Sequence, residues 1–206
     1  DIYKIESGTY ELRPVPIDLI RVVYQIHKEL QELFSAKECG FEVLLDGIPI
    51  GLEKIFEIPG EEMLFYSMLG NLIKNAVEAS PEKGKVTVGL GTNPHPFIFI
   101  QNAGLIPAEI RDKFMEKYRS SGKEKGVGLG AYSAKLMAGV LGGVISYTSA
   151  EPEGTIIRIE FPAAQKGLAE TPQGVRIAPA VNSLCGWIRA LVMDGNELMR
   201  SVIRQT

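Results

Sequence analysis

Apolar residues recur with a helical period in three long stretches of the chain. Over residues 17–36 they fall three or four positions apart, which predicts one amphipathic helix. The same spacing predicts a helix over residues 61–79 and a glycine-led helix over residues 128–143. Shorter stretches over residues 107–118 and 180–203 also suit helices.

Apolar runs bounded by turn residues predict the strands. In chain order, the expected strands cover residues 9–13, 41–45, 85–90, 97–102, 144–150 and 155–161. Residues 51–58 suit either a strand or a loop, and the last two strands suit a hairpin around residues 151–154. Because the strands are grouped in pairs with helices between them, the pattern favours a two-layer α/β sandwich over a repeated strand–helix–strand unit.

Composition narrows the class of protein. A formal net charge of −3 and a pI near 5.6 argue against nucleic acid as an electrostatic partner. Cys39 and Cys185 fit no metal-ligand spacing and indicate free thiols in a reducing, cytoplasmic compartment. We see no apolar run long enough to span a bilayer. The chain starts at Asp1 without methionine, so we interpret it as an excised piece, whose parent protein could still carry a membrane anchor.

The predicted helix over residues 61–79 carries two asparagines, although asparagine is a mediocre helix former. One face of this helix is apolar, with Phe65, Leu69, Leu72 and Ala76. The opposite face brings Asn71, Lys74 and Asn75 together, with Glu78 one turn further on. Taken alone, this pattern is better interpreted as a solvated surface.

A second feature changes that interpretation. Residues 126–130 read GVGLG and lead directly into a helix. Glycines let the backbone approach a ligand closely, and a helix start offers unpaired N–H groups and a positive dipole end. Lys123 and Lys125 lie just before these glycines and add positive charge. Asparagines, a lysine and glycine-led amides together suggest a site for a nucleotide with a metal ion.

Several motifs now carry a specific resemblance. NLIKNAVEAS, from residue 71, resembles the asparagine box of the ATP-binding catalytic domain of sensor histidine kinases. GVGLGAYSAK resembles the second glycine box, RDKFMEKYRSSGKEKG the phenylalanine box and ATP lid, and GGVISYTSAEPEGTIIRIEFP the closing hairpin. The resemblance covers residues 10–162, in the family's order. It implies the Bergerat fold, in which about three helices cover one face of a mixed, mainly antiparallel sheet.

The resemblance also implies ATP and Mg²⁺ as cofactors and a role for each matching residue. Asn75 would supply a side-chain oxygen to Mg²⁺, Asn71 would contact phosphate or the metal shell, and Lys74 would balance phosphate charge. In hydrolysing relatives a glutamate stands where this chain has Asn71, which cannot act as a general base. The resemblance therefore favours phosphoryl transfer to a protein over rapid hydrolysis. The nucleotide contacts would come from Asn71, Asn75, Asn102, Gly104, Ser121, Lys123, Gly126, Gly128, Leu129, Gly130 and Thr155.

The first glycine box departs from the family pattern. The family has an aspartate that accepts a hydrogen bond from the adenine amine, whereas this chain reads FIFIQNAGLIPAEI and keeps only Gly104. Strand alternation places Asn102 on the same side as Ile98 and Ile100, and Gln101 on the other side, so Asn102 is the better replacement. We therefore expect weaker ATP binding and looser discrimination between bases than is usual.

A complete kinase needs a phosphoacceptor histidine, and neither His27 nor His95 stands in a suitable motif. We expect residues 1–15 to be a linker from a dimerisation and phosphoacceptor domain outside this chain, and residues 16–162 to be the catalytic domain. Residues 163–206 would form a linker and a C-terminal helix. The implied partners are that acceptor domain and a response regulator, with no nucleic acid, in a homodimeric parent. This piece alone should not autophosphorylate.

Two other functions stay open at the level of sequence. The altered first glycine box would suit a degenerate module of the same fold that serves as a protein-interaction platform. An anti-sigma type serine kinase shares the fold as well. The intact asparagine pair and the glycine-led helix favour the histidine kinase.

Overall fold

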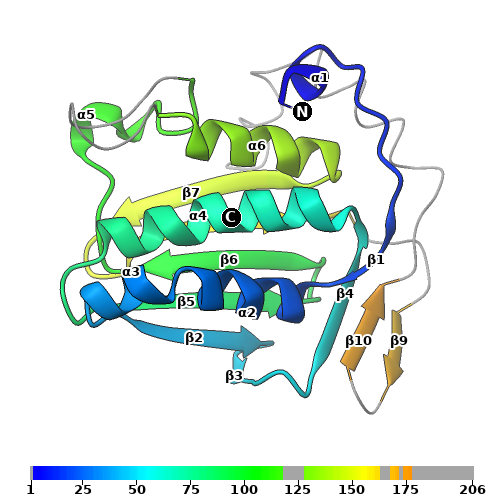
Figure 1. Ribbon diagram of the computed structural model, residues 1–206, viewed down its shortest axis with the longest axis horizontal. Helices are drawn as coiled ribbons and strands as arrows, with labels where there is room; N and C mark the ends of the chain where they lie inside the picture. The colour runs from blue at the N-terminus through cyan, green and yellow to red at the C-terminus, as the bar shows by residue number, and fades with distance from the viewer. Residues whose placement is uncertain (1, 118–127, 163–167, 172–173, 178–206) are drawn as a thin grey trace.

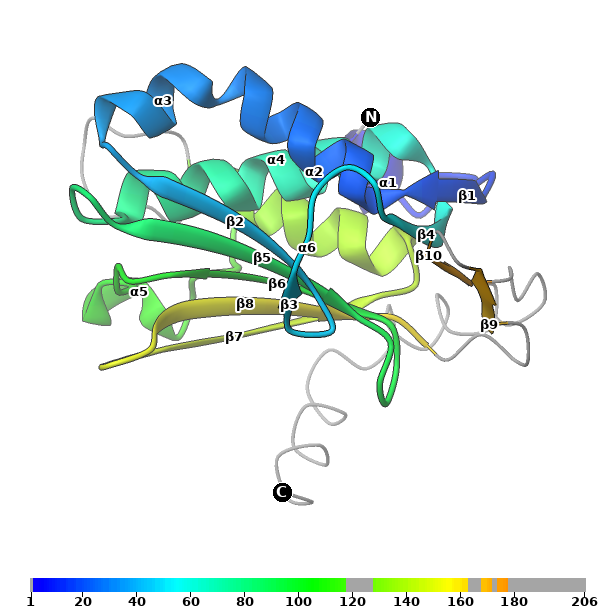
Figure 2. The same ribbon diagram turned by 90° about the horizontal axis from the view of Figure 1, so that it is seen from below.

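The computed structural model describes residues 2–117, 128–162, 168–171 and 174–177. Its centre is a six-stranded sheet with the strand order β3-β2-β5-β6-β8-β7. Helices α2, α4 and α6 lie on one face of this sheet, with α4 between the other two (Figures 1 and 2). The sheet strands are β2 Gly40–Leu45, β3 Ile48–Pro49, β5 Lys85–Gly91, β6 Phe97–Asn102, β7 Val144–Ala150 and β8 Gly154–Glu160. The helices are α1 Ile2–Glu6, α2 Leu19–Glu29, α3 Gln31–Ala36, α4 Glu62–Ala79, α5 Ala108–Arg111 and α6 Gly130–Val140.

The predicted two-layer architecture is therefore confirmed. Only β2 and β5 run parallel, and the other neighbouring strands of this sheet are antiparallel. Along β6, buried residues alternate with less buried ones, as expected for a sheet that is covered on one face. Ile98, Ile100 and Asn102 are on the buried side, while Phe97, Phe99 and Gln101 are on the other.

Helix α4 is the centre of the core. The predicted apolar stripe of this helix is buried throughout, and Phe65, Leu69 and Leu72 have no exposed surface. They pack with α2 and with the covered side of β5 and β6 in one continuous cluster. This packing fixes the rotation of α4 about its axis and turns Asn71 and Asn75 away from the core, where both are half-buried.

A second, four-stranded sheet has the order β1-β4-β10-β9, with β1 Val15–Asp18, β4 Ile55–Gly60, β9 Leu168–Thr171 and β10 Gly174–Ile177. The open choice between strand and loop over residues 51–58 resolves to β4. The single helix predicted over residues 17–36 is wrong, because the chain forms β1, α2 and α3 there. Asp18 explains the boundary, since its Oδ1 accepts hydrogen bonds from Ile20 N and from Phe56 N, both at 3.2 Å. One side chain thus caps α2 and also binds β4.

The ends of the domain differ from the sequence-based prediction. Residues 9–13 form no strand, and the region interpreted as a linker begins with helix α1. Residues 168–171 and 174–177, also interpreted as linker, are β9 and β10. Helix α5 is shorter than the predicted helix over residues 107–118. The helix predicted over residues 180–203 lies outside the described residues.

The N-terminal segment packs on the domain through Glu61, the residue just before α4. Tyr10 Oη donates to Glu61 Oε2 at 2.7 Å, and the backbone N–H of Arg13 donates to Glu61 Oε1 at 2.6 Å. The hydrogen bond to Glu61 also raises the pKa of the Tyr10 hydroxyl. In the part of the chain that the structure describes, no helix is long and apolar enough to cross a membrane.

Candidate functional site

The polar face of α4 meets the first residue of α6. A Cβ atom at Gly130 would lie 3.5 Å from Asn75 Nδ2, 3.7 Å from Asn75 Oδ1 and 3.9 Å from Asn71 Cβ. The fold therefore brings together two asparagines and a glycine that are more than fifty residues apart in the sequence. The asparagine face of α4 is not merely solvated, because the start of another helix packs against it.

The start of α6 is suited to an anion. Gly128 has a φ of +68°, a left-handed conformation that turns the chain into the helix. No described side chain caps this helix start, so its first N–H groups have no side-chain acceptor there. The aligned peptides of an 11-residue helix add partial positive charge at the same place. Gly128, Leu129 and Gly130 thus lie where the sequence predicts a phosphate site.

Lys74 lies on the exposed side of the asparagine face. Its Nζ is 4.0 Å from Glu78 Oε1, and the two side chains are 57% and 40% exposed. An exposed ion pair of this kind is weak and holds neither side chain firmly. Lys74 is therefore next to the site without taking part in the Asn75–Gly130 contact.

A second group of predicted residues meets at the C-terminal end of α4. A Cβ atom at Gly104 would lie only 1.9 Å from the carbonyl oxygen of Ala79, so this position requires glycine. The carbonyl oxygen of Gly104 accepts hydrogen bonds from Thr155 Oγ1 at 2.7 Å and from Asn102 Nδ2 at 3.3 Å. Asn102, Gly104 and Thr155 are thus one connected unit.

The same unit contains residues that the sequence analysis missed. Ser149 Oγ is 3.0 Å from Thr155 Oγ1 and accepts a hydrogen bond at 2.8 Å from the backbone N–H of Ile106. Ser149 is 8% exposed and lies on β7 opposite Thr155. The sequence signal for Ser149 was a polar residue within the predicted hairpin. Its hydrogen-bond partners could not be predicted, because they follow only from the register of the strands.

Asn102 is the buried polar residue at the end of β6, with 4% exposure. It shares the covered side of the sheet with Ile98 and Ile100, which confirms the predicted alternation. Gln101, the rejected alternative, donates instead to the carbonyl oxygen of Glu153 at 3.0 Å. The amide nitrogen of Asn102 thus holds the Gly104 carbonyl, and this bond fixes the side chain at the end of β6.

Some predicted residues are not part of either group. Ser121, Lys123 and Gly126 lie outside the described residues.

His27, which the sequence analysis did not assign to the site, packs in an aromatic cluster. It stacks on Phe41 with 4.1 Å between ring centroids and meets the edge of Phe34 at 4.8 Å. Burial in this aromatic cluster lowers the pKa of His27, as expected for a structural side chain.

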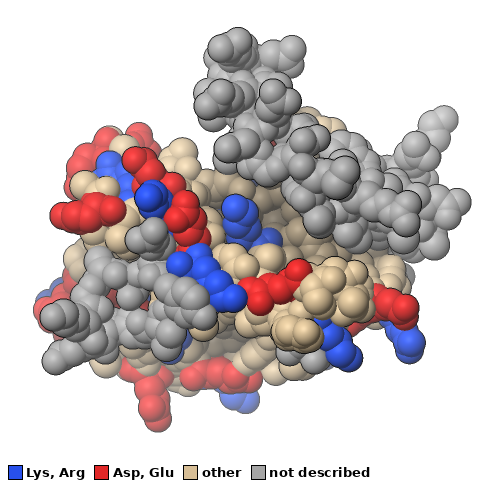
Figure 3. All heavy atoms as spheres, turned by 90° about the horizontal axis from the view of Figure 1, so that it is seen from above, with Lys and Arg blue, Asp and Glu red and all other residues tan. Residues whose placement is uncertain are grey.

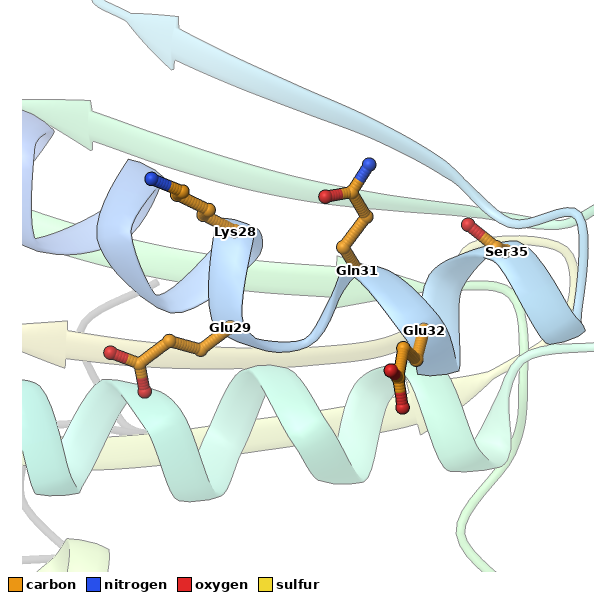
Figure 4. Close-up of a pocket in the computed structure, with 5 residues that line it drawn as sticks. All are labelled: Lys28, Glu29, Gln31, Glu32 and Ser35. Atoms are coloured by element: carbon orange, nitrogen blue, oxygen red, sulfur yellow. The ribbon is translucent and has the colours of Figure 1, made fainter.

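A separate surface hollow of about 430 Å³ lies on α2 and α3 (Figure 4). It is lined by Lys28, Glu29, Gln31, Glu32 and Ser35, none of which belongs to the site described above.

The charged side chains of the surface are mixed in sign. Figure 3 views the molecule from the side that carries α1, α5 and α6, and shows acidic and basic side chains next to one another. Among the described residues, no three His, Cys, Asp or Glu side chains are grouped to hold a metal ion. A metal ion bound beside Asn71 and Asn75 would therefore depend on side-chain amide oxygens and on oxygen atoms of the ligand itself.

Comparison with known proteins identifies relatives of this arrangement. The family model described as "Histidine kinase-, DNA gyrase B-, and HSP90-like ATPase" matches residues 60–165, just over half of the chain. An uncharacterised sensor-like histidine kinase of Rhizobium meliloti is 28% identical over 183 residues. That match covers 82% of this chain and 33% of the relative, so the chain spans about a third of that protein.

Solved structures share the fold. The mycobacterial sensor histidine kinase MprB superposes with a TM-score of 0.61 at 25% identity, covering 73% of this chain and 97% of the MprB chain. Histidine kinase ThkA, in a complex with the response regulator protein TrrA, gives a TM-score of 0.57 at 20% identity. That match covers 78% of this chain and 46% of the other, and at this identity it supports the fold alone.

Proposed function

Since the chain belongs to the histidine kinase-, DNA gyrase B- and HSP90-like ATPase family, we propose that it is the ATP-binding catalytic domain of a two-component sensor histidine kinase. The observation that carries the proposal is the position of Gly130, at the start of α6, directly beside Asn75 and Asn71. It joins an anion-binding helix start to a pair of amide side chains. A nucleotide bound as its Mg²⁺ complex can use both kinds of group, the amides for phosphate and the side-chain oxygens for the metal.

The residues present fit such a complex. Mg²⁺ prefers oxygen ligands, keeps several waters and is commonly held between a few protein oxygens and substrate phosphates. Asn75 would supply a side-chain oxygen, Asn71 would lie in the metal or phosphate shell, and the first amides of α6 would bind phosphate. The metal would neutralise charge on the phosphates during transfer. Lys74, which is exposed beside the asparagines, would add a further positive charge.

Asn102 would bind the base. Because Nδ2 donates to the Gly104 carbonyl, the amide would present Oδ1 as an acceptor, as a carboxylate would. An acceptor suits the exocyclic amine of adenine and not the carbonyl oxygen of guanine. This geometry favours ATP over GTP, and so changes our sequence-based expectation of loose base discrimination. The expectation of weaker binding than with a carboxylate stays, because a neutral amide gives no charge assistance.

The chain's own residues favour transfer over hydrolysis. By the resemblance, Asn71 would occupy the place from which a general base acts on water, and an amide cannot accept a proton there. Catalysis would then rest on positioning the nucleotide and neutralising its charge. The phosphoacceptor would be a histidine on a dimerisation domain outside this chain. A response regulator would receive the phosphoryl group next, in a cytoplasmic part of a homodimeric parent.

The degenerate interaction platform is the weaker proposal. Gly104 gives no evidence for either function, because the fold itself requires glycine there. The uncapped start of α6 beside Asn75 is different, because the fold does not require it. A platform without nucleotide would have no use for uncapped amides next to two half-buried asparagine side chains.

Calorimetric titration with ATP, in the presence and absence of Mg²⁺, tests the proposal. We expect Mg²⁺-dependent binding that weakens about 100-fold in Asn75→Ala, since a metal ligand is lost. Ser67→Ala, on the same face of α4 two turns away, is the matched control and should bind like the wild type. A folded wild-type sample that does not bind millimolar Mg-ATP would favour the platform. Transfer of phosphate to a separately supplied acceptor domain would then test the kinase activity.

A further inference from the structure

The carboxylate of Glu6 joins α1 to two residues more than a hundred positions further along the chain. Glu6 Oε1 accepts a hydrogen bond from Lys117 Nζ at 2.7 Å and another from Tyr132 Oη at 2.8 Å. Lys117 Nζ also lies 5.6 Å from the centroid of the Tyr132 ring. Glu6 is 111 residues from Lys117 and 126 residues from Tyr132 along the chain. We call these three residues the Glu6 cluster.

Tyr132 connects this cluster to the nucleotide site. It follows Gly130 by two positions in the first turn of α6, and successive residues of a helix differ by about 100° in direction. Gly130 faces Asn75 on α4, so Tyr132 points to the other side of α6, where α1 lies. The first turn of α6 is therefore held from both sides, by α4 and by α1.

The N-terminal segment also reaches the start of α4. Four residues after Glu6, Tyr10 donates to Glu61, and Arg13 does so through its backbone. The segment from Glu6 to Arg13 thus bridges the two helices whose contact forms the proposed phosphate end. This segment lies before residue 60, where the match to the family begins.

We propose that Glu6 is a positioning residue for nucleotide binding, which acts through Tyr132 and Lys117 on the first turn of α6. The proposal rests on the proposed function, because it needs the start of α6 to bind phosphate. Docking of α1 and binding of nucleotide would then be coupled. By thermodynamic reciprocity, each would strengthen the other by the same factor.

The size of the effect follows from the environment of the cluster. The side chains of Lys117 and Glu6 are 39% and 28% exposed, so the ion pair is partly screened by water. Loss of such a contact should weaken binding modestly, by about two- to fivefold. Glu6→Ala removes both acceptor contacts, Glu6→Gln keeps an acceptor without charge, and Tyr132→Phe removes one donor. We expect Glu6→Ala to have the largest effect, with the other two between it and the wild type.

The experiment measures the dissociation constant of Mg-ATP for the whole chain and for each variant, with thermal denaturation to confirm folding. Because the two residues are coupled, Glu6→Ala combined with Tyr132→Phe should weaken binding by less than the product of the two single effects. Glu11→Ala removes an exposed carboxylate from the same segment and should leave binding unchanged. Hydrogen exchange supplies a readout that simple destabilisation would not give. Mg-ATP should slow exchange of the amides of residues 2–9 in the wild type and not in Glu6→Ala.

The outcomes separate the two proposals. If the wild type binds Mg-ATP and Glu6→Ala binds equally well, the role of Glu6 is overturned while the proposed function stands. Tighter binding by Glu6→Ala, or an equal loss in Glu11→Ala, would also overturn it. If the folded wild type does not bind Mg-ATP at all, the proposed function fails, and the role of Glu6 fails with it.

Discussion

The two ends of the candidate site are built in opposite ways. At the proposed phosphate end, the half-buried side chains of Asn71 and Asn75 on α4 face the open start of α6, and the fold makes few demands on them. At the proposed base end, Asn102, Ser149 and Thr155 are almost fully buried and bonded to backbone groups of one loop. Substitution at the phosphate end should therefore change ligand binding alone. At the base end, substitution should change the free energy of unfolding as well.

Gly104→Ala should have the largest effect on stability. Its methyl group would overlap the carbonyl oxygen of Ala79, so the loop or the end of α4 must move. We expect a loss of about 3 kcal/mol or more in the free energy of unfolding, measured with urea. Gly70→Ala is the matched control, because a methyl group there meets nothing within 4 Å inside α4. That change should stabilise the protein by about 0.5–1 kcal/mol through helix propensity. Equal stability of the Gly104→Ala and wild-type proteins would contradict the rigid base end.

Thr155→Val tests the hydrogen bonds of the base end without changing the shape of the side chain. It removes the donor to the Gly104 carbonyl and the partner of Ser149 Oγ. Loss of partners for buried polar groups should cost about 1–3 kcal/mol in chemical denaturation. Thr148→Val, at an exposed position of the same hairpin, should change stability by less than about 0.5 kcal/mol. A similar loss from both substitutions would point to strand packing rather than to this network.

Asn102→Asp should separate stability from base recognition. A carboxylate cannot donate to the Gly104 carbonyl, and it is costly to bury, so the free energy of unfolding should fall by about 1–2 kcal/mol. Charge assistance to the adenine amine should still raise the ratio of ATP to GTP affinity by about fivefold. Gln101→Glu, on the opposite side of β6, is the control for added charge and should leave that ratio unchanged. A lower ATP preference in Asn102→Asp would show that Asn102 does not contact the base.

His27 gives the smallest expected effect and lies away from both ends. Burial lowers its pKa in the folded protein below the ordinary value of 6.5. The unfolded chain then binds more protons between the folded pKa and 6.5, so stability is fully present above pH 6.5 and falls as pH decreases through that window. Urea denaturation at pH 5.5–7.5 measures this slope. His27→Phe keeps an aromatic ring against Phe41 and should flatten it. A slope that persists in His27→Phe must come from other groups.

The central helices and strands could be predicted from sequence because each carries its own pattern. The apolar stripe of α4, the alternation of β6 and the hairpin of β7 and β8 are local signals, and the observed bounds follow them closely. Ile17 was misplaced in a helix because its apolar side chain fits the helical spacing as well as it fits β1. The pairing of β1 with the distant β4 and the bond of Asp18 to Phe56, 38 residues away, decide between the two. Strand β10 likewise depends on pairing with the distant β4, and β9 on pairing with β10, whereas their local composition suggested a linker.

The site divides in the same way. The resemblance led us to expect Asn71, Asn75 and Gly130 in one site, and the structure brings these residues together, whereas their chemical roles stay predictions. The supports of the base end could not, since Ser149 gains its role from strand register and Gly104 from the nearby end of α4. The role proposed for Glu6 depends on contacts across more than a hundred residues, and no local pattern signals it.

The pairing of β10 with β4 has a consequence for solubility. Gly174–Arg176 pair in parallel with Ile55–Glu57, so β10 covers one side of a strand whose other side is already paired with β1. An uncovered strand edge presents unpaired N–H and C=O groups, and these are a template for pairing with another molecule. A chain shortened to residue 162 would leave that side of β4 open. Such a truncated protein should keep its helices and its main sheet, yet self-associate at concentrations where the longer chain stays in solution.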